Sequence, residues 1–371
     1  MQKILLWILL LISPILYETS LTHALLFAEI VLIVSYYIKV RRNSHGKLLK
    51  EVSLLFYLLL FWSVFILITH EIDFNSLVRI VQLITCYCCF YIFSIEKWNQ
   101  ATLRVIRNVV CLIIFVLLLV WIAIFKSLDG FTVVYSNPDT FASLLLSWFL
   151  FLFLFKPRKF FFILICFFLL LTTGARAAFF SILFFLGSYY LSCKIRFVRN
   201  HYKFIFVFFV VLLFSFIIIY PYLLLFDFGD QLNTLSHAYF NKNLLSGRHT
   251  VWLEMFDKIK AAPWLGWGLS ADPSIVGIMK SSHNLFVQTT LQSGFIGLFL
   301  LIILLYKVYA VNIKIGSVGY RSFLICSFLA ILFHECFEIN LTQNALAIGL
   351  VMWATLGLSC NNYFINNQES K

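Results

Sequence analysis

A histidine and two amides stand at the start of a long apolar segment. His283 and Asn284 directly precede it, and Gln288 follows Asn284 by four residues, so helical spacing places both amides on one face. Histidine side chains exchange protons near neutral pH, which makes His283 a candidate general base. A histidine at a helix end is also a common polar cap, and the residue alone leaves both interpretations open.

Two arginines are candidates for holding an anion. Arg176 ends the turn 173–176 (Thr-Gly-Ala-Arg) between two apolar segments, and Arg248 lies in a large polar segment. Ser246 is expected to cap a helix whose first turn contains Arg248. The helix dipole disfavours cations at an N-terminus, so an arginine there indicates an anion nearby. The alternatives are a snorkelling anchor for Arg176 and a solvated surface side chain for Arg248.

Other polar and aromatic side chains extend this set. His334, Glu335 and Glu338 lie near the end of a late apolar segment. Ionisable groups at membrane depth indicate a functional site, or else they line a wet cavity. The turn 263–268 (Pro-Trp-Leu-Gly-Trp-Gly) could stack on a sugar ring, although anchoring at the membrane interface is the commoner role of such residues.

The elements that must position these residues are membrane helices. Of the 371 residues, 62% are hydrophobic and 12% are charged, whereas a soluble domain is about 45 to 50% apolar and about 25% charged. The expected fold class is all-α, a polytopic transmembrane helical bundle of about twelve helices. The expected spans are 4–18, 22–39, 52–69, 77–95, 108–125, 139–155, 160–174, 177–193, 204–225, 285–306, 322–338 and 342–360.

The distribution of charge predicts how the chain crosses the membrane. The net charge is +12, but the lysines and arginines form short clusters between apolar segments, which indicates topology rather than nucleic-acid binding. With both termini inside, most of the 28 basic residues fall on the inner side. Residues 1–371 are then one membrane domain, and residues 226–282 form one large outer loop between the ninth and tenth spans.

The cysteines and the first apolar segment have ordinary interpretations. All nine cysteines lie in or at the ends of apolar segments, where they behave as small hydrophobic residues, so neither a disulfide framework nor a metal site is expected. The first apolar segment, residues 4–17, lacks a small-residue cleavage site and is interpreted as a retained helix.

Three segments together resemble a known family. His283-Asn284, nine residues, Gly294, two residues and Gly297 resemble the histidine signature of the bacterial O-antigen ligase and polymerase family. The turn at Arg176 resembles that family's arginine at a short outer turn. The segment 246–252, with Arg248 and Trp252, and the turn 263–268 resemble its large periplasmic loop. The resemblance covers roughly residues 135 to 300.

The resemblance implies glycosyl transfer between lipid-linked sugars at the periplasmic face of the bacterial inner membrane, without a cofactor, nucleotide sugar or metal. The donor would be an undecaprenyl-pyrophosphate-linked oligosaccharide, with Arg176 and Arg248 on its pyrophosphate. His283 would take the proton of the acceptor hydroxyl, with inversion at the anomeric carbon. Further contacts with sugar or phosphate are expected from Asn284, Gln288, His249, Trp252, Asn137 and His334.

Within the family, the compact loop and the tryptophan pattern favour an O-antigen polymerase, which joins repeat units. An O-antigen ligase, which moves the finished polymer to the lipid A core, is the alternative, and a capsule or exopolysaccharide polymerase is a third form of the same chemistry. From another class, a lipid-linked oligosaccharide flippase also has about twelve spans, but it requires charges deep within several helices. Glu29 is a rare mid-helix charge here. Besides the bilayer, a flippase and a chain-length regulator are expected partners.

Overall fold

The computed structural model describes an all-helical chain over residues 2–16, 18–42, 49–70, 72–125, 130–133, 135–155, 160–225, 227–240, 247–277, 281–313, 318–361 and 363–364, and no strand occurs within these ranges. The α-helices in this part of the chain are α1 (Gln2–Ile15), α2 (Thr22–Arg42), α3 (Lys50–Thr69), α4 (Phe74–Ile95), α5 (Gln100–Val120), α6 (Pro138–Phe153), α7 (Phe160–Thr172), α8 (Arg176–Lys194), α9 (Arg196–Asn200), α10 (Tyr202–Ile219), α11 (Asp227–Phe240), α12 (Arg248–Ala261), α13 (Leu285–Ile313), α14 (Val318–His334) and α15 (Leu346–Ser359).

Seven of the described helices, α2, α3, α4, α5, α8, α10 and α13, are long and apolar enough to cross a membrane. Five shorter apolar helices, α1, α6, α7, α14 and α15, stand at the positions of the other five expected spans. The prediction of an all-α protein with many membrane helices is confirmed, and the count of twelve spans stays a prediction.

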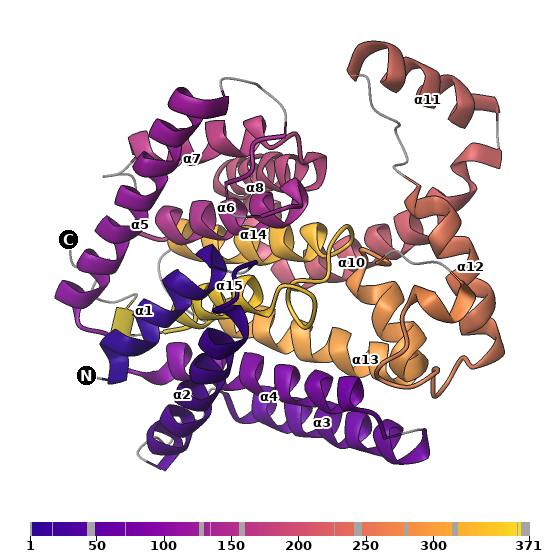
Figure 1. Cartoon of the computed structure of the whole chain (residues 1–371), viewed down its shortest axis with the longest axis horizontal. Helices are drawn as coiled ribbons and strands as arrows, with labels where there is room; N and C mark the ends of the chain where they lie inside the picture. The colour runs from indigo at the N-terminus through magenta and orange to yellow at the C-terminus, as the bar shows by residue number, and fades with distance from the viewer. Residues whose placement is uncertain are drawn as a thin grey trace.

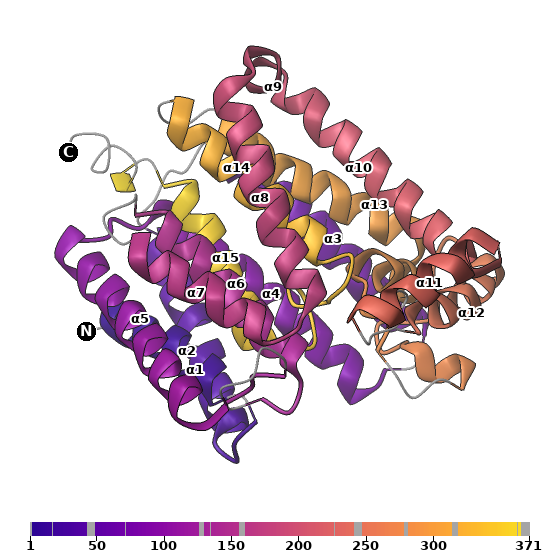
Figure 2. The same ribbon diagram turned by 90° about the horizontal axis from the view of Figure 1, so that it is seen from above.

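The helix α15 lies near the middle of the bundle in both views (Figures 1 and 2). It packs along α4 and also touches α6 and α1, and every one of its residues is buried. A helix that is apolar on all sides is expected in such a central position, because no face of it needs to meet water. Glu29 on α2 is buried as well, and it accepts a hydrogen bond from Ser13 Oγ at 2.6 Å.

The chain between α14 and α15 departs from the expected spans. Spans at 322–338 and 342–360 were expected, but α14 ends at His334 and α15 begins at Leu346. Residues 335–345, the 335–345 segment from here on, leave the helix. Glu335 Oε2 accepts a bond from the backbone nitrogen of Leu341 at 3.1 Å, and Asn344 has a φ of 42°. Polar side chains that bond to nearby backbone compete in this way with helical hydrogen bonds.

The segment between α10 and α13, expected as one large loop, is itself partly helical. It contains α11, α12 and the short 3-10 helix η5 (Pro273–Val276), and Figure 1 shows α11 standing away from the other helices beyond α12. The expected helix start at Arg248 is confirmed. Its N-cap position falls on Gly247, which has a φ of 75°, and Ser246 lies outside the described residues.

Candidate active site

A buried carboxylate joins two of the candidate residues. Glu338 Oε1 lies 3.3 Å from Arg248 Nη2, and Glu338 Oε2 lies 3.2 Å from His283 Nδ1. The side chain of Glu338 is only 5% exposed, so both contacts are shielded from bulk water. Because Nδ1 of His283 faces this carboxylate, Nε2 is the ring nitrogen left to take a proton from a substrate.

The backbone at His283 is held in an unusual conformation. Its φ of 46° lies in the left-handed region, which residues other than glycine seldom adopt without support from their surroundings. Asn284 supplies that support, since its Oδ1 accepts from the backbone nitrogens of Phe286 and Val287 and its Nδ2 donates to the carbonyl of Cys336 at 2.9 Å. Asn284 therefore caps α13 and ties it to the 335–345 segment.

Gln288 and Trp252 both bond to Ser282, the residue that precedes His283. Gln288 accepts a bond from Ser282 Oγ at 2.8 Å and donates to the carbonyl of Ala271 at 2.6 Å. Trp252 is fully buried, and its Nε1 donates to the carbonyl of Ser282 at 2.7 Å.

Asn284, Gln288 and Trp252, which were expected to contact substrate, are buried, and their polar groups bond within the protein. Their bonds hold the backbone around His283. The expected contact with substrate stays a prediction.

Arg248 lies between two carboxylates. Besides Glu338, its Nη2 lies 3.7 Å from Asp139 Oδ2, and its guanidinium lies over the ring of Phe337. Asp139 is held in the first turn of α6 by Asn137, whose side chain accepts a bond from the Asp139 backbone nitrogen at 2.9 Å. Asn137 thus caps the helix that carries Asp139, and Asp139 is the more exposed of the two carboxylates at 35%.

Arg176 is the first residue of α8, directly after the turn predicted from the sequence. Gly174 makes this turn with a φ of 69°, and the Arg176 side chain is half-buried. The backbone of Ala177, the next residue, lies beside the ring of His334, and the Arg248 guanidinium lies within electrostatic range of that ring. The helix α8, which begins at Arg176, therefore passes His334 on α14.

The remaining two histidines of the expected site differ in burial. His334 is buried, and its Nε2 lies 2.9 Å from Ser143 Oγ on α6; its expected contact with substrate stays a prediction. His249 is half-buried next to Arg248 in the first turn of α12. Its Nδ1 is buried and has no hydrogen-bond partner among the described residues.

The glycine of the histidine signature allows two segments to touch. Gly294 breaks α13 with φ 67° and ψ −175°, and a Cβ at this position would lie 2.0 Å from the carbonyl oxygen of Trp264. The backbone nitrogen of Phe295 donates to the carbonyl of Pro263 at 2.8 Å, and that of Trp267 donates to the carbonyl of Leu291 at 2.8 Å. The turn 263–268 thus bonds to backbone groups of α13 that the kink leaves without a helical partner. These bonds hold α12, which carries Arg248, against α13.

Sequence reasoning named Glu338 only as part of a polar group and gave it no role, and it did not single out Asp139. Glu338 had a signal, because it is an ionisable residue near the end of an apolar segment. Asp139 had only its place after Asn137 and Pro138 at the start of an apolar segment. Neither signal could reveal that both carboxylates meet Arg248, which is far from them along the chain.

The comparisons with known proteins agree with the motifs. The family model described as O-antigen ligase matches residues 160–302, a range that contains Arg176, Arg248 and His283 and ends before Glu338. No curated protein matches the chain. The match and the three motifs confirm, over these residues, the resemblance of the chain to the bacterial O-antigen ligase and polymerase family.

Proposed function

We propose that this protein is an O-antigen polymerase, an inverting glycosyltransferase that joins undecaprenyl-pyrophosphate-linked repeat units at the periplasmic face of the inner membrane. The observation that carries the proposal is the contact of Glu338 with both Arg248 and His283. The residues proposed as base and as phosphate ligand thus share one carboxylate, and both belong to the range that matches the O-antigen ligase family model.

In the proposed reaction, His283 Nε2 takes the proton of the acceptor hydroxyl. The hydroxyl oxygen forms a bond to the anomeric carbon of the donor from the side opposite the pyrophosphate. The bond between that carbon and the pyrophosphate oxygen breaks, and its electron pair leaves with undecaprenyl pyrophosphate. Glu338 orients the imidazole and stabilises the positive charge that His283 gains, as a carboxylate does for a histidine base.

Arg248 and Arg176 would bind the pyrophosphate of the donor. Arginine suits this task because its planar fork of N–H donors binds phosphate oxygens in pairs and keeps its charge. Arg176 forms no hydrogen bond or ion pair with the described residues, so its donors are available. Arg248 would exchange the 3.7 Å contact with Asp139 for phosphate while keeping Glu338. Contacts that strengthen as the leaving group gains charge lower the barrier.

An O-antigen ligase is the second candidate, and the description of the matching family model favours it. The chemistry would be the same, with the lipid A core in place of a second lipid-linked repeat unit as the acceptor. The preference for the polymerase rests on the pattern of Arg248, Trp252 and the turn 263–268 in the sequence. A chain-length regulator and a flippase would work beside either enzyme.

Deletion of the gene in its native host separates these functions. Lipopolysaccharide from the deletion strain is compared on a gel with that from strains complemented by wild type, Arg176→Ala, Arg248→Ala or His283→Ala. We expect core that carries a single repeat unit, restored to a full ladder by wild type alone. Bare core with accumulated lipid-linked polymer would instead identify a ligase, and an unchanged ladder would exclude both.

A further inference from the structure

The polar group at the end of α14 contains one buried acid that the proposed reaction does not use. Glu335 directly follows α14, and its side chain is fully buried. Its Oε2 accepts a bond from the backbone nitrogen of Leu341 at 3.1 Å, and the backbone nitrogen of Asn340 faces the same carboxyl group. A side chain that binds backbone N–H groups further along the chain closes a loop. We call residues 335–341 the 335–341 loop.

Glu338 lies midway between the two ends of the 335–341 loop. From this position its carboxylate contacts Arg248 at 3.3 Å and His283 at 3.2 Å. The residues of a short closed loop have fewer conformations than those of an open segment of the same length. The bond of Glu335 therefore limits where Glu338 can lie.

The start of the 335–341 loop is fixed to the residues that follow His283. The carbonyl of Glu335 accepts from the backbone nitrogen of Leu285 at 2.9 Å. The carbonyl of Cys336 accepts from Asn284 Nδ2 at 2.9 Å. The candidate base and the first two residues of the loop are thus joined by neighbouring bonds, so a movement of one is passed to the other.

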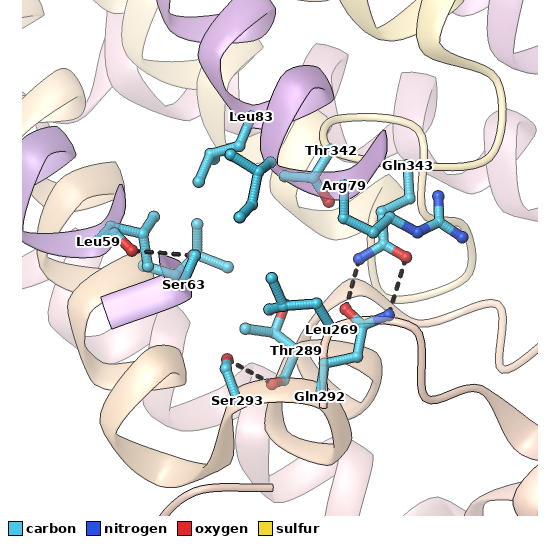
Figure 3. A pocket seen from close by; sticks show the side chains of 12 residues that line it. Leu59, Ser63, Arg79, Leu83, Leu269, Thr289, Gln292, Ser293, Thr342 and Gln343 are labelled. Atoms are coloured by element: carbon cyan, nitrogen blue, oxygen red, sulfur yellow. Dashed lines mark hydrogen bonds between the residues drawn. The ribbon is translucent and has the colours of Figure 1, made fainter. Parts of the chain in front are cut away.

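The end of the 335–341 loop is fixed to the interior of the bundle. The carbonyl of Leu341 accepts from Trp353 Nε1 on α15 at 2.7 Å and from Cys86 Sγ on α4 at 3.4 Å. Two residues further on, Gln343 bonds to Gln292 of α13 in both directions, at 3.3 and 2.6 Å (Figure 3). The carboxyl group of Glu335 joins this end to the start of the loop.

Removal of this carboxyl group would disturb Glu338 rather than the ends of the loop. Leu341 is buried, so its backbone N–H would lose its acceptor in a place without water. An unpaired buried donor is costly, and this cost disfavours the closed loop. The loop would relax until the N–H found another acceptor, and Glu338 would move with it.

We propose that Glu335 is a positioning residue that holds Glu338 between Arg248 and His283 by closing the 335–341 loop. The proposal rests on the proposed function, in which Glu338 orients the imidazole of His283. The role requires an acceptor oxygen at residue 335, and it requires neither a charge nor a proton transfer there. Glutamine, whose amide oxygen accepts the same bond, should therefore replace Glu335, whereas leucine, which fills a similar space, should not.

Transfer kinetics separate this role from one in stability alone. In Glu335→Leu, kcat should fall by about tenfold or more, because the buried bond that holds the loop closed is lost. Glu335→Gln should recover most of the wild-type kcat. Glu29→Leu is the matched control, since Glu29 is equally buried and accepts a bond from Ser13. It should keep wild-type kcat whatever its unfolding temperature.

A double variant shows whether Glu335 acts through Glu338. When Glu335→Leu is combined with Glu338→Gln, kcat should be no lower than in Glu338→Gln alone, since residues that act as one unit do not add their effects. Losses that multiply would overturn the proposal. A low kcat in Glu335→Gln at the wild-type unfolding temperature would overturn it as well, because the charge of Glu335 would then be what the reaction requires.

Nuclear magnetic resonance gives a readout without any transfer reaction. Full-length protein with 15N-labelled histidine is measured in detergent, and the His283 signals are identified by their absence in His283→Asn. A proton on Nδ1 that is bound to a carboxylate resonates downfield, because the bond is charge-assisted. We expect this signal in wild type, Glu335→Gln and Glu29→Leu, and its loss in Glu335→Leu and Glu338→Gln.

An unchanged signal in Glu335→Leu would refute the positioning role. If wild type transfers no sugar but Glu335→Leu still loses the signal, the proposed function fails while the positioning of Glu338 by Glu335 remains.

Discussion

His283 Nδ1 lies 3.2 Å from Glu338 Oε2, although 55 residues separate the two along the chain. The other oxygen of the same carboxylate lies 3.3 Å from Arg248. One buried side chain thus sets the distance between the candidate base and the candidate phosphate ligand. Substitutions can separate this positioning from the chemistry itself.

Replacing Glu338 with Gln should lower kcat for glycosyl transfer by about 100-fold. The glutamine keeps the size of the side chain and a hydrogen bond to His283, but it loses the charge that stabilises the protonated imidazole. The measurement is transfer between purified lipid-linked donor and acceptor. Glu254→Gln, at an exposed position on α12, is the matched control and should keep wild-type kcat. A wild-type rate in Glu338→Gln would remove the carboxylate from the mechanism.

Replacing Asp139 with Asn should lower the KM for the lipid-linked donor by roughly two- to fivefold, the range of a partly exposed ion pair. Asp139 lies 3.7 Å from Arg248 and competes with an incoming pyrophosphate for the same guanidinium. Asparagine removes the competing charge, and the cap by Asn137 uses only the backbone nitrogen of residue 139. Donor titrations at fixed acceptor measure this effect. A higher donor KM would show instead that Asp139 is needed to hold Arg248 in place.

Replacing Gly294 with Ala should destabilise the protein by on the order of 2 to 3 kcal/mol or more, since a side chain meets both strain and a clash there. The Cβ would lie 2.0 Å from the carbonyl oxygen of Trp264, on a backbone with φ 67°. Thermal unfolding in detergent measures the loss. Gly187→Ala, within α8, is the control because no atom lies within 4 Å of its Cβ, and it should be neutral or stabilising. Equal unfolding temperatures for the two variants would contradict this account of the kink.

The membrane helices and the start of α12 could be predicted from the sequence alone. A chain segment that crosses lipid must pair its own backbone N–H and C=O groups, and a helix does so within one continuous segment. Such segments can therefore be found in the sequence as apolar stretches long enough to cross a bilayer. The histidine signature and the turn at Arg176 also predicted the family, and residues 160–302 match it. These properties depend on local order and spacing, which the sequence contains in full.

The tertiary structure decided which polar side chains reach the site. Helical spacing put Asn284 and Gln288 on one face, but packing turned that face inward, where both amides bond to the protein. Expected spans ran through residues 335–338, whereas the chain leaves the helix there and brings Glu338 to Arg248, 90 residues away in sequence. Hydropathy records how apolar a segment is, but not which distant carboxylate will meet which arginine, because only the packing of the helices sets that distance.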